Sequence, residues 1–280
     1  MPLVGFHCKR GFRTIDECLE CPSRCIVPQP ILELSHKNQR GYYAHRDREY
    51  HVTSLLGCPR KAVCNREYGE YVPPKNLWKM QIGTLAHDMM ENNPVGKGIA
   101  EKLLQFTFYV DVDGNKEKCN VVGKFDWWDH NDNLIHDYKF ISTTRYIPNE
   151  KHFKQMAVYY LLGTESGEFD DGEVLGGQID YVDVANGNPY KYRSTGKPFL
   201  DRVELMRNKI PIMLAHFIRA EREAVLPDGD PGEDECNYCP KDFKAFCYQG
   251  GYAKVDTNDL NVVRIGIQAF RRDNTPEDED

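Results

Sequence analysis

The sequence predicts an α/β fold with a mixed sheet, and three observations support this prediction. Apolar residues recur at helical spacing between Leu77 and Asn92, and three strand-like segments lie between Gln105 and Phe140. A further helix and strand follow before Val184. This alternation is typical of α/β proteins. With 280 residues, 40% of them hydrophobic, the chain can bury one such core and a small additional module.

Three regions follow one another along the chain. We predict a cysteine-rich N-terminal module at residues 1–40, a core at 41–250, and a C-terminal extension at 251–280 that ends in an acidic tail. Pro28 and Pro30 are expected to break regular structure at the end of the first region. The module carries four cysteines that either form a Zn²⁺ knuckle or remain unliganded thiols: Cys8, Cys18, Cys21 and Cys25.

The first predicted helix of the core is amphipathic. Its apolar stripe consists of Trp78, Ile82, Leu85 and Met89. On another stripe Gly83, His87 and Glu91 are spaced four residues apart and share one face. We expect Gly83 to permit the close approach of another backbone, and His87 to offer an imidazole to a metal.

Three strands are predicted next, each joined to the following one by a short turn. They are Gln105–Val112, Val121–Trp128 and Leu134–Phe140. Asp113-Gly114-Asn115 is a hairpin-type turn, and Asp132-Asn133 is predicted to form the second turn. The second and third strands should therefore be antiparallel neighbours.

These two strands carry the residues that point most directly to chemistry. Asp126 lies on one strand, and Asp137-Tyr138-Lys139 lies on the other. Two carboxylates on neighbouring strands provide the hard oxygen ligands that Mg²⁺ and Mn²⁺ prefer. Because side chains alternate along a strand, Lys139 shares the face of Asp137 and can act beside the metal. The pattern indicates a metal-dependent phosphodiesterase.

The remainder of the core contains two helices and a strand. Glu150–Leu162 reads as a helix on which Gln155 and Tyr159 are four residues apart and can reach a common ligand shell. Val174–Val184 is predicted as a strand with Leu175, Ile179 and Tyr181 in one phase. A long helix is expected over Phe199–Glu223, with a kink or break at Pro211.

A second group of cysteines lies near the end of the core. Because the N-terminus lacks the apolar segment of a secretory signal, we expect metal-bound thiolates rather than disulfides. Three soft ligands come from Cys236, Cys239 and Cys247. The fourth is Cys58 or Cys64, and four thiolates suit either Zn²⁺ or a 4Fe-4S cluster.

Charge and hydropathy limit the range of partners. The net charge is −7, and the last eight residues carry five negative charges, so residues 1–272 have a net charge of −2. A nearly neutral body favours a narrow substrate channel over a broad basic face. No apolar segment approaches the roughly 20 residues of a membrane span, so we expect a cytoplasmic protein with no membrane partner.

Taken in order, these motifs resemble the RecB-like branch of the PD-(D/E)xK nucleases, and in particular its iron-sulfur members, the CRISPR-associated RecB-like exonucleases and the AddB-type nuclease domain. The resemblance covers about Thr53 to Cys247. It implies a restriction-endonuclease-like α/β/α core closed by a cysteine-ligated cluster. Phe125 stands where the family name has proline.

The resemblance also implies roles for single residues. The Mg²⁺ or Mn²⁺ ligands would be Asp126, Asp137, the carbonyl of Tyr138 and, in addition, His87. Lys139 would orient the attacking water, and Gln155 with Tyr159 would steady the site. The 4Fe-4S ligands would be Cys58, Cys236, Cys239 and Cys247.

Two hypotheses follow for the function. In the first, the protein is a deoxyribonuclease, an exonuclease that hydrolyses single-stranded DNA ends in a prokaryotic or phage-infected cytoplasm. In the second, it is a catalytically silent iron-sulfur subunit that binds DNA or protein partners in CRISPR adaptation, antiviral defence or recombination. The full set of His87, Asp126, Asp137 and Lys139 favours the enzyme, because a degenerate site has no reason to keep all four groups.

Overall fold

The computed structural model describes residues 3–22, 27–39, 48–92, 97–170, 172–227, 236, 239–247 and 260–273. Its three mixed sheets and their helices confirm the α/β class. The chain forms two compact units. Unit 1 contains Met1–Arg46, Gly57–Gln81 and His216–Asp280, and unit 2 contains Asp47–Leu56 and Ile82–Ala215. These units do not follow the boundaries of the three predicted regions.

Unit 1 is built on a three-stranded sheet in the order β2-β1-β4. Its elements are β1 (Leu3–Cys8), β2 (Gly11–Thr14), α1 (Ile15–Leu19), α2 (Gln29–Gln39), α4 (Pro59–Tyr68), β4 (Glu70–Val72), α8 (Lys241–Lys244) and α9 (Leu260–Asp273). Two longer helices, α5 (Pro74–Asn92) and α7 (Gly196–Glu223), contribute residues to both units. Buried apolar residues form the core: Leu3, Phe6, Ile15, Val27, Leu32, Val72 and Leu77.

The N-terminal region is more regular than the sequence suggested. Thr14 and Glu17 form a reciprocal capping box that starts α1. Pro30 lies in the first turn of α2 rather than breaking regular structure. Proline is tolerated there because the first-turn N–H groups have no partner within the helix.

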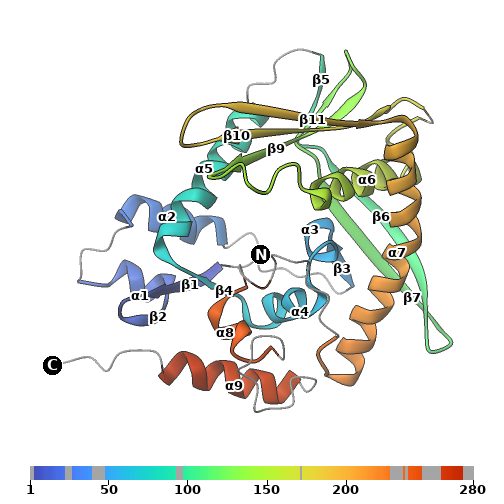
Figure 1. The fold of residues 1–280 in the computed structure, drawn as a ribbon. Coiled ribbons are helices and arrows are strands. Elements are labelled where there is room, and N and C mark those ends of the chain that lie inside the picture. Colours follow the sequence, from blue (N-terminus) through green and yellow to red (C-terminus); the bar gives the residue numbers. More distant parts are fainter. Residues whose placement is uncertain are drawn as a thin grey trace. The chain divides into compact units, whose positions relative to one another are not determined.

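Unit 2 contains two sheets, one in the order β11-β10-β9-β8-β5 and the other in the order β3-β7-β6 (Figure 1). The elements are β3 (Glu49–His51), α3 (Val52–Leu55), β5 (Gly98–Ala100), β6 (Leu103–Val112), β7 (Asn115–Lys124), β8 (Trp127–Asp129), β9 (Leu134–Ile141), α6 (Glu150–Glu165), β10 (Gly176–Asp183) and β11 (Pro189–Thr195). The predicted hairpin is confirmed, because β6 pairs antiparallel with β7 up to Val112 and Asn115. Asp113 and Gly114 both have positive φ, as a two-residue type I′ turn requires.

The predicted strand Val121–Trp128 is wrong as a single element. The chain leaves β7 after Lys124 and enters a different sheet as β8 at Trp127. Phe125, between the two strands, is fully buried and its ring centroid lies 6.0 Å from that of Phe169. Burial of this ring at the break offsets the interrupted pairing, and Asp126 is left at the junction of the two sheets.

Strand β9 is the centre of the larger sheet. It pairs antiparallel with β8, as predicted, and parallel with β10. Helix α6, confirmed by the structure, packs on one face of β9 and β10 (Figure 1). Gly177 allows this contact, because a Cβ there would lie 2.6 Å from Met156 Sδ.

Two helices depart from the sequence predictions. Helix α7 continues through Pro211, so no break occurs there. In α5 the predicted apolar stripe is exposed at Ile82, Leu85 and Met89, and the side chain of Trp78 lies outside the described residues. A Cβ at Gly83 would meet nothing within 4 Å, so the expected backbone approach is not found.

Within the described part of the chain, no helix has the combined length and apolarity needed to cross a membrane.

Protonation of His152 on α6 is coupled to folding. Burial, followed by the charge of Lys139, lowers the pKa of His152 from 6.5 to about 4. The backbone N–H of Asn149 donates to the Tyr181 hydroxyl, which lies 2.8 Å from His152 Nδ1 and can donate its own hydrogen there. Between pH 6.5 and 4 the unfolded chain binds a proton that the folded chain does not. The free energy of unfolding should therefore decrease as the pH is lowered, by about 3 kcal/mol between pH 6.5 and pH 4.

We expect His152→Gln to remove this part of the pH dependence. Urea unfolding at a series of pH values between 7 and 4 measures the difference between the variant and the wild type. Lys154→Gln on the same helix serves as the control and should keep the wild-type slope. Parallel curves for His152→Gln and wild type would show that His152 titrates alike in both states.

Candidate functional site

Four of the predicted residues converge in unit 2. His87 Nδ1 on α5 lies 3.3 Å from Asp126 Oδ1. Lys139 Nζ lies 2.8 Å from Asp137 Oδ1, and both side chains come from the same face of β9. The backbone N–H of Tyr138, directly after Asp137, donates to Asp126 Oδ2 at 2.6 Å. The site is therefore held together by strand β9 and the junction before β8.

A carboxylate that the sequence did not indicate completes the cluster. Glu101 lies between β5 and β6, and its Oε1 is 3.0 Å from His87 Nδ1. Ligand atoms of His87, Glu101 and Asp126 all lie within 4.8 Å of one another. The side chain of Glu101 is only 2% exposed, and it also pairs with Lys124 at the end of β7.

The position of Glu101 follows from the way the chain changes sheets. It passes from β5 in one sheet to β6 in the other at Glu101, and returns from β7 to β8 at Asp126. The two crossings are adjacent, because the N–H of Glu101 donates to the carbonyl of Asp126 at 3.0 Å. Glu101 adopts a φ of 50°, which is uncommon for a residue with a side chain.

The electrostatics of the cluster reflect an excess of buried negative charge. Burial, then the charge of Asp137, raises the pKa of Asp126 to about 7. The pKa of His87 is raised, chiefly by its hydrogen bond to Glu101. Burial by itself would lower the pKa of Lys139, but the charges of Asp137 and Asp126 outweigh it and raise that pKa. A cation among these carboxylates would relieve their mutual repulsion.

Gln155 and Tyr159 lie next to the cluster on α6. Gln155 Nε2 donates to the Tyr159 hydroxyl at 2.6 Å, and both side chains are buried. Burial and the charge of Asp137 raise the pKa of Tyr159, which is therefore neutral. The phenol of Tyr138 is on the opposite face of β9, so this residue reaches the site through its backbone alone.

The cysteines of the C-terminal group belong to unit 1. Cys58 is the N-cap of α4, and Cys239 precedes α8. Burial raises the pKa of the Cys239 thiol to about 12; the charge of Lys61 opposes this shift, and Cys247, Cys58 and Cys236 add to it. Burial also raises the pKa of Cys64, and the charge of Cys239 is the next largest cause. Neither this group nor Cys8, Cys18 and Cys21 forms a set of three ligands within 4.8 Å among the described residues. Cys25 lies outside them.

The fold and the clustered side chains thus define an α/β protein in which a half-buried imidazole and two buried carboxylates meet at the junction of two sheets. No family model matches the chain, and no curated protein matches it. Among solved structures, the crystal structure of SSO0001 is similar, with a TM-score of 0.51 and 18% identity. The match covers 77% of this chain and 94% of that one. At this level of identity the likeness concerns the fold.

Gly123 on β7 lets α6 approach the site. A Cβ at Gly123 would lie 2.7 Å from Tyr159 Cε1 and 2.7 Å from Val52 Cγ2. We therefore expect Gly123→Ala to reduce the free energy of unfolding by about 1–3 kcal/mol through overpacking. Gly83→Ala is the matched control and should increase stability by up to about 1 kcal/mol, because alanine favours a helix. Thermal unfolding of both variants provides the measurement, and equal effects would contradict the packing argument.

Proposed function

We propose that the protein is a metal-dependent nuclease of the RecB-like PD-(D/E)xK type, and that it hydrolyses single-stranded DNA from an end. The observation that carries the proposal is the convergence of His87, Glu101 and Asp126 beside Asp137 and Lys139. A sheet in which β9 pairs with β8 and β10, and α6 covers one face, also fits a restriction-endonuclease-like core. If the protein were a catalytically silent subunit, there would be no reason for a further buried acid, Glu101, to lie beside these residues.

The donor set fits Mg²⁺ or Mn²⁺. Three carboxylates supply the hard oxygen ligands that Mg²⁺ and Mn²⁺ prefer, and of these two ions the transition metal Mn²⁺ accepts the imidazole of His87 more readily. Asp137 Oδ2 is buried and lies 2.7 Å from Lys139 Nζ, and a carboxylate oxygen paired with one ammonium keeps a second lone pair for a cation. A divalent ion held there would supply Lewis-acid activation of water and of the scissile phosphate.

Side chains of the protein would bind the ion, stabilise charge on the phosphate and position the site. Asp126 and Asp137 hold the ion, and Glu101 either binds it or orients His87 through their hydrogen bond. The Lys139 ammonium faces the same space and can offset the negative charge that develops on the phosphate. Tyr159 and Gln155 position the α6 side of the site. The carbonyl of Tyr138 stays a proposed ligand.

We further propose that Cys58, Cys236, Cys239 and Cys247 hold a 4Fe-4S cluster. Their mutual electrostatic influence fits a common site. Four thiolates on one tetrahedral Zn²⁺ would lie about 3.8 Å apart, given a Zn–S distance of about 2.3 Å. A cubane places each thiolate on a different iron and so accepts wider spacing between the sulfur atoms. Such a cluster would link α4 to the segment around α8.

The nuclease proposal predicts loss of cleavage in Asp137→Asn and Lys139→Met, by about 10²-fold or more. The assay uses single-stranded DNA labelled at the 5′ or the 3′ end, with Mn²⁺, Mg²⁺ or a chelator, and it also reveals the direction of digestion. Glu101→Gln should raise the Mn²⁺ concentration needed for half-maximal rate by about tenfold.

Controls for these variants come from an exposed ion pair on α7. Lys197 Nζ lies 2.8 Å from Asp201 Oδ1, and both side chains are solvent-exposed. Lys197→Met and Asp201→Asn should therefore cleave like the wild type. Undiminished Mn²⁺-dependent cleavage by purified Asp137→Asn, or absence of cleavage by the wild type under all these conditions, would refute the proposal.

The cluster proposal predicts a brown protein after anaerobic purification and loss of that colour in Cys239→Ser. Cys119→Ala, at a buried cysteine on β7, should stay brown. Comparing Cys58→Ser with Cys64→Ser identifies the fourth ligand, because only the true ligand should reduce the iron content. A colourless wild type that contains zinc by elemental analysis would replace the cluster by a zinc site and leave the nuclease proposal intact.

A further inference from the structure

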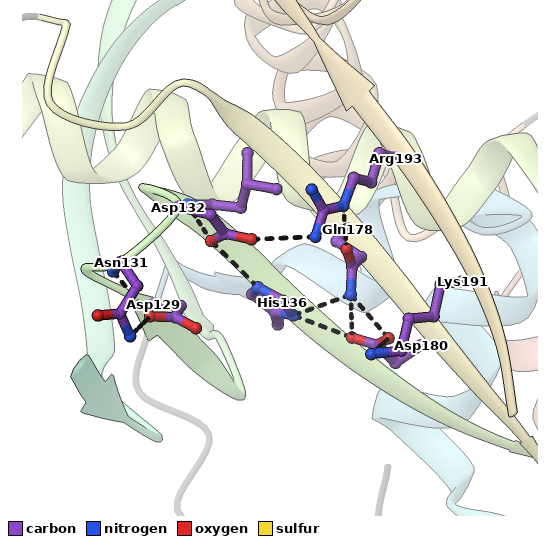
Figure 2. A network of polar contacts seen from close by, with 9 residues as sticks. Asp129, Asn131, Asp132, His136, Gln178, Asp180, Lys191 and Arg193 are labelled. Atoms are coloured by element: carbon purple, nitrogen blue, oxygen red, sulfur yellow. Dashed lines mark hydrogen bonds and ion pairs between the residues drawn. The ribbon is translucent and has the colours of Figure 1, made fainter. Parts of the chain in front are cut away.

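A second group of potential metal ligands lies on the other face of β9. His136 precedes Asp137 on this strand, so its side chain points away from the site described above. Asp129 ends β8, Asp132 belongs to the turn that follows, and ligand atoms of these two aspartates and His136 lie within 4.8 Å of one another. Figure 2 shows the three side chains near the turn of the β8–β9 hairpin.

The buried imidazole of His136 has one satisfied and one unsatisfied nitrogen. Its side chain is 9% exposed, and Nδ1 lies 2.9 Å from Asp180 Oδ2 on the neighbouring strand β10. Nε2 is buried and has no hydrogen-bond partner in the described structure, although Asp132 Oδ1 is 3.5 Å away. A buried polar atom without a partner is costly, so a missing ligand is the expected explanation.

The partners of Asp180 fix the tautomer of the imidazole. Asp180 receives hydrogen bonds from Gln178 Nε2 at 2.8 and 2.9 Å, as Figure 2 shows. An ionised carboxylate only accepts, so Nδ1 carries the hydrogen. In the neutral ring Nε2 then presents a lone pair toward an oxygen of Asp132. A cation between the two atoms would bind both.

The two aspartates are held in place by contacts that leave room for a ligand bond. Asn131 donates to Asp129 Oδ1 through its backbone and its side chain, at 2.8 and 2.7 Å. Arg193 Nη2 lies 3.2 Å from Asp132 Oδ2, and the N–H of Leu134 donates to Asp132 Oδ1 at 3.2 Å. Lys191 Nζ lies 3.9 Å from Asp180 Oδ1. Each of these carboxylates can still bind a cation, either through a second lone pair of the oxygen that is already bonded or through its other oxygen.

We propose that His136, Asp129 and Asp132 bind a second divalent cation of the first transition row, Mn²⁺ or Zn²⁺. Asp180 serves as the carboxylate that orients the metal-binding imidazole, which is the usual arrangement around histidine ligands. Three protein ligands leave positions for water. The ion ties β8 to β9 and thereby fixes the spacing of Asp126, which precedes β8, and Asp137, which lies on β9. The proposal does not depend on the nuclease function, because the two sets of side chains occupy opposite faces of β9.

The experiment uses Mn²⁺ as the probe, added to full-length protein that has been stripped of loosely bound metal with a chelator. Mn²⁺ prefers oxygen and imidazole over thiolate, so the cysteines compete little. His87→Asn removes the imidazole of the first cluster. In this variant, pulsed electron paramagnetic resonance should still detect a nitrogen directly bonded to Mn²⁺, and the signal should vanish in His87→Asn/His136→Gln.

His87→Asn/His130→Gln is the matched control, since His130 lies in the same hairpin outside the ligand set, and it should keep the signal. If His136→Gln fails to fold, Asp132→Asn replaces it. Asp132 is part of a surface turn, and the number of Mn²⁺ ions bound in equilibrium dialysis should fall by one. Absence of a bonded nitrogen in His87→Asn, or an unchanged number of bound ions in Asp132→Asn, would overturn the proposal. A proton rather than a metal ion would then lie between His136 and Asp132.

Discussion

The arrangement of unit 2 depends on one backbone hydrogen bond, from the N–H of Glu101 to the carbonyl of Asp126. It joins the two places where the chain crosses between sheets, and so brings together residues that belong to different strands. The pairings of β5 with β8 and of β6 with β7 flank this bond on either side and keep the two crossings next to each other. The positive φ of Glu101 is the local cost of the crossing, and the contacts of its buried side chain offset that cost.

Local features could be predicted from the sequence, and features set by distant contacts could not. Asp113 and Gly114 specify their turn because the backbone conformation they need is one that few residues adopt. Asp137 and Lys139 share a face by strand periodicity alone. Glu101 gave no comparable signal, because its role depends on a contact across the chain with Asp126. The break at Phe125 was hidden, since its apolar side chain continues the pattern of a strand.

The predictions that proved wrong share a similar cause. Pro30 is compatible with a helix only at the first turn, and only the structure shows that α2 begins just before it. The exposed residues of α5 show that helical spacing of apolar side chains predicts the helix but does not determine which face is buried. Helix α7 is not broken at Pro211 because one lost hydrogen bond is a small part of a helix that runs from Gly196 to Glu223.

Strand β11 forms one edge of the five-stranded sheet, and the three-residue strand β5 forms the other. Exposed edges offer unpaired backbone groups to other chains, and proteins counter this with short strands, proline and inward or outward charges. Pro189 starts β11, while Lys191 and Arg193 project from it with side chains more than half exposed. These features disfavour the addition of a foreign strand at either edge, so they protect the sheet against aggregation as well as contributing to the polar network beside His136.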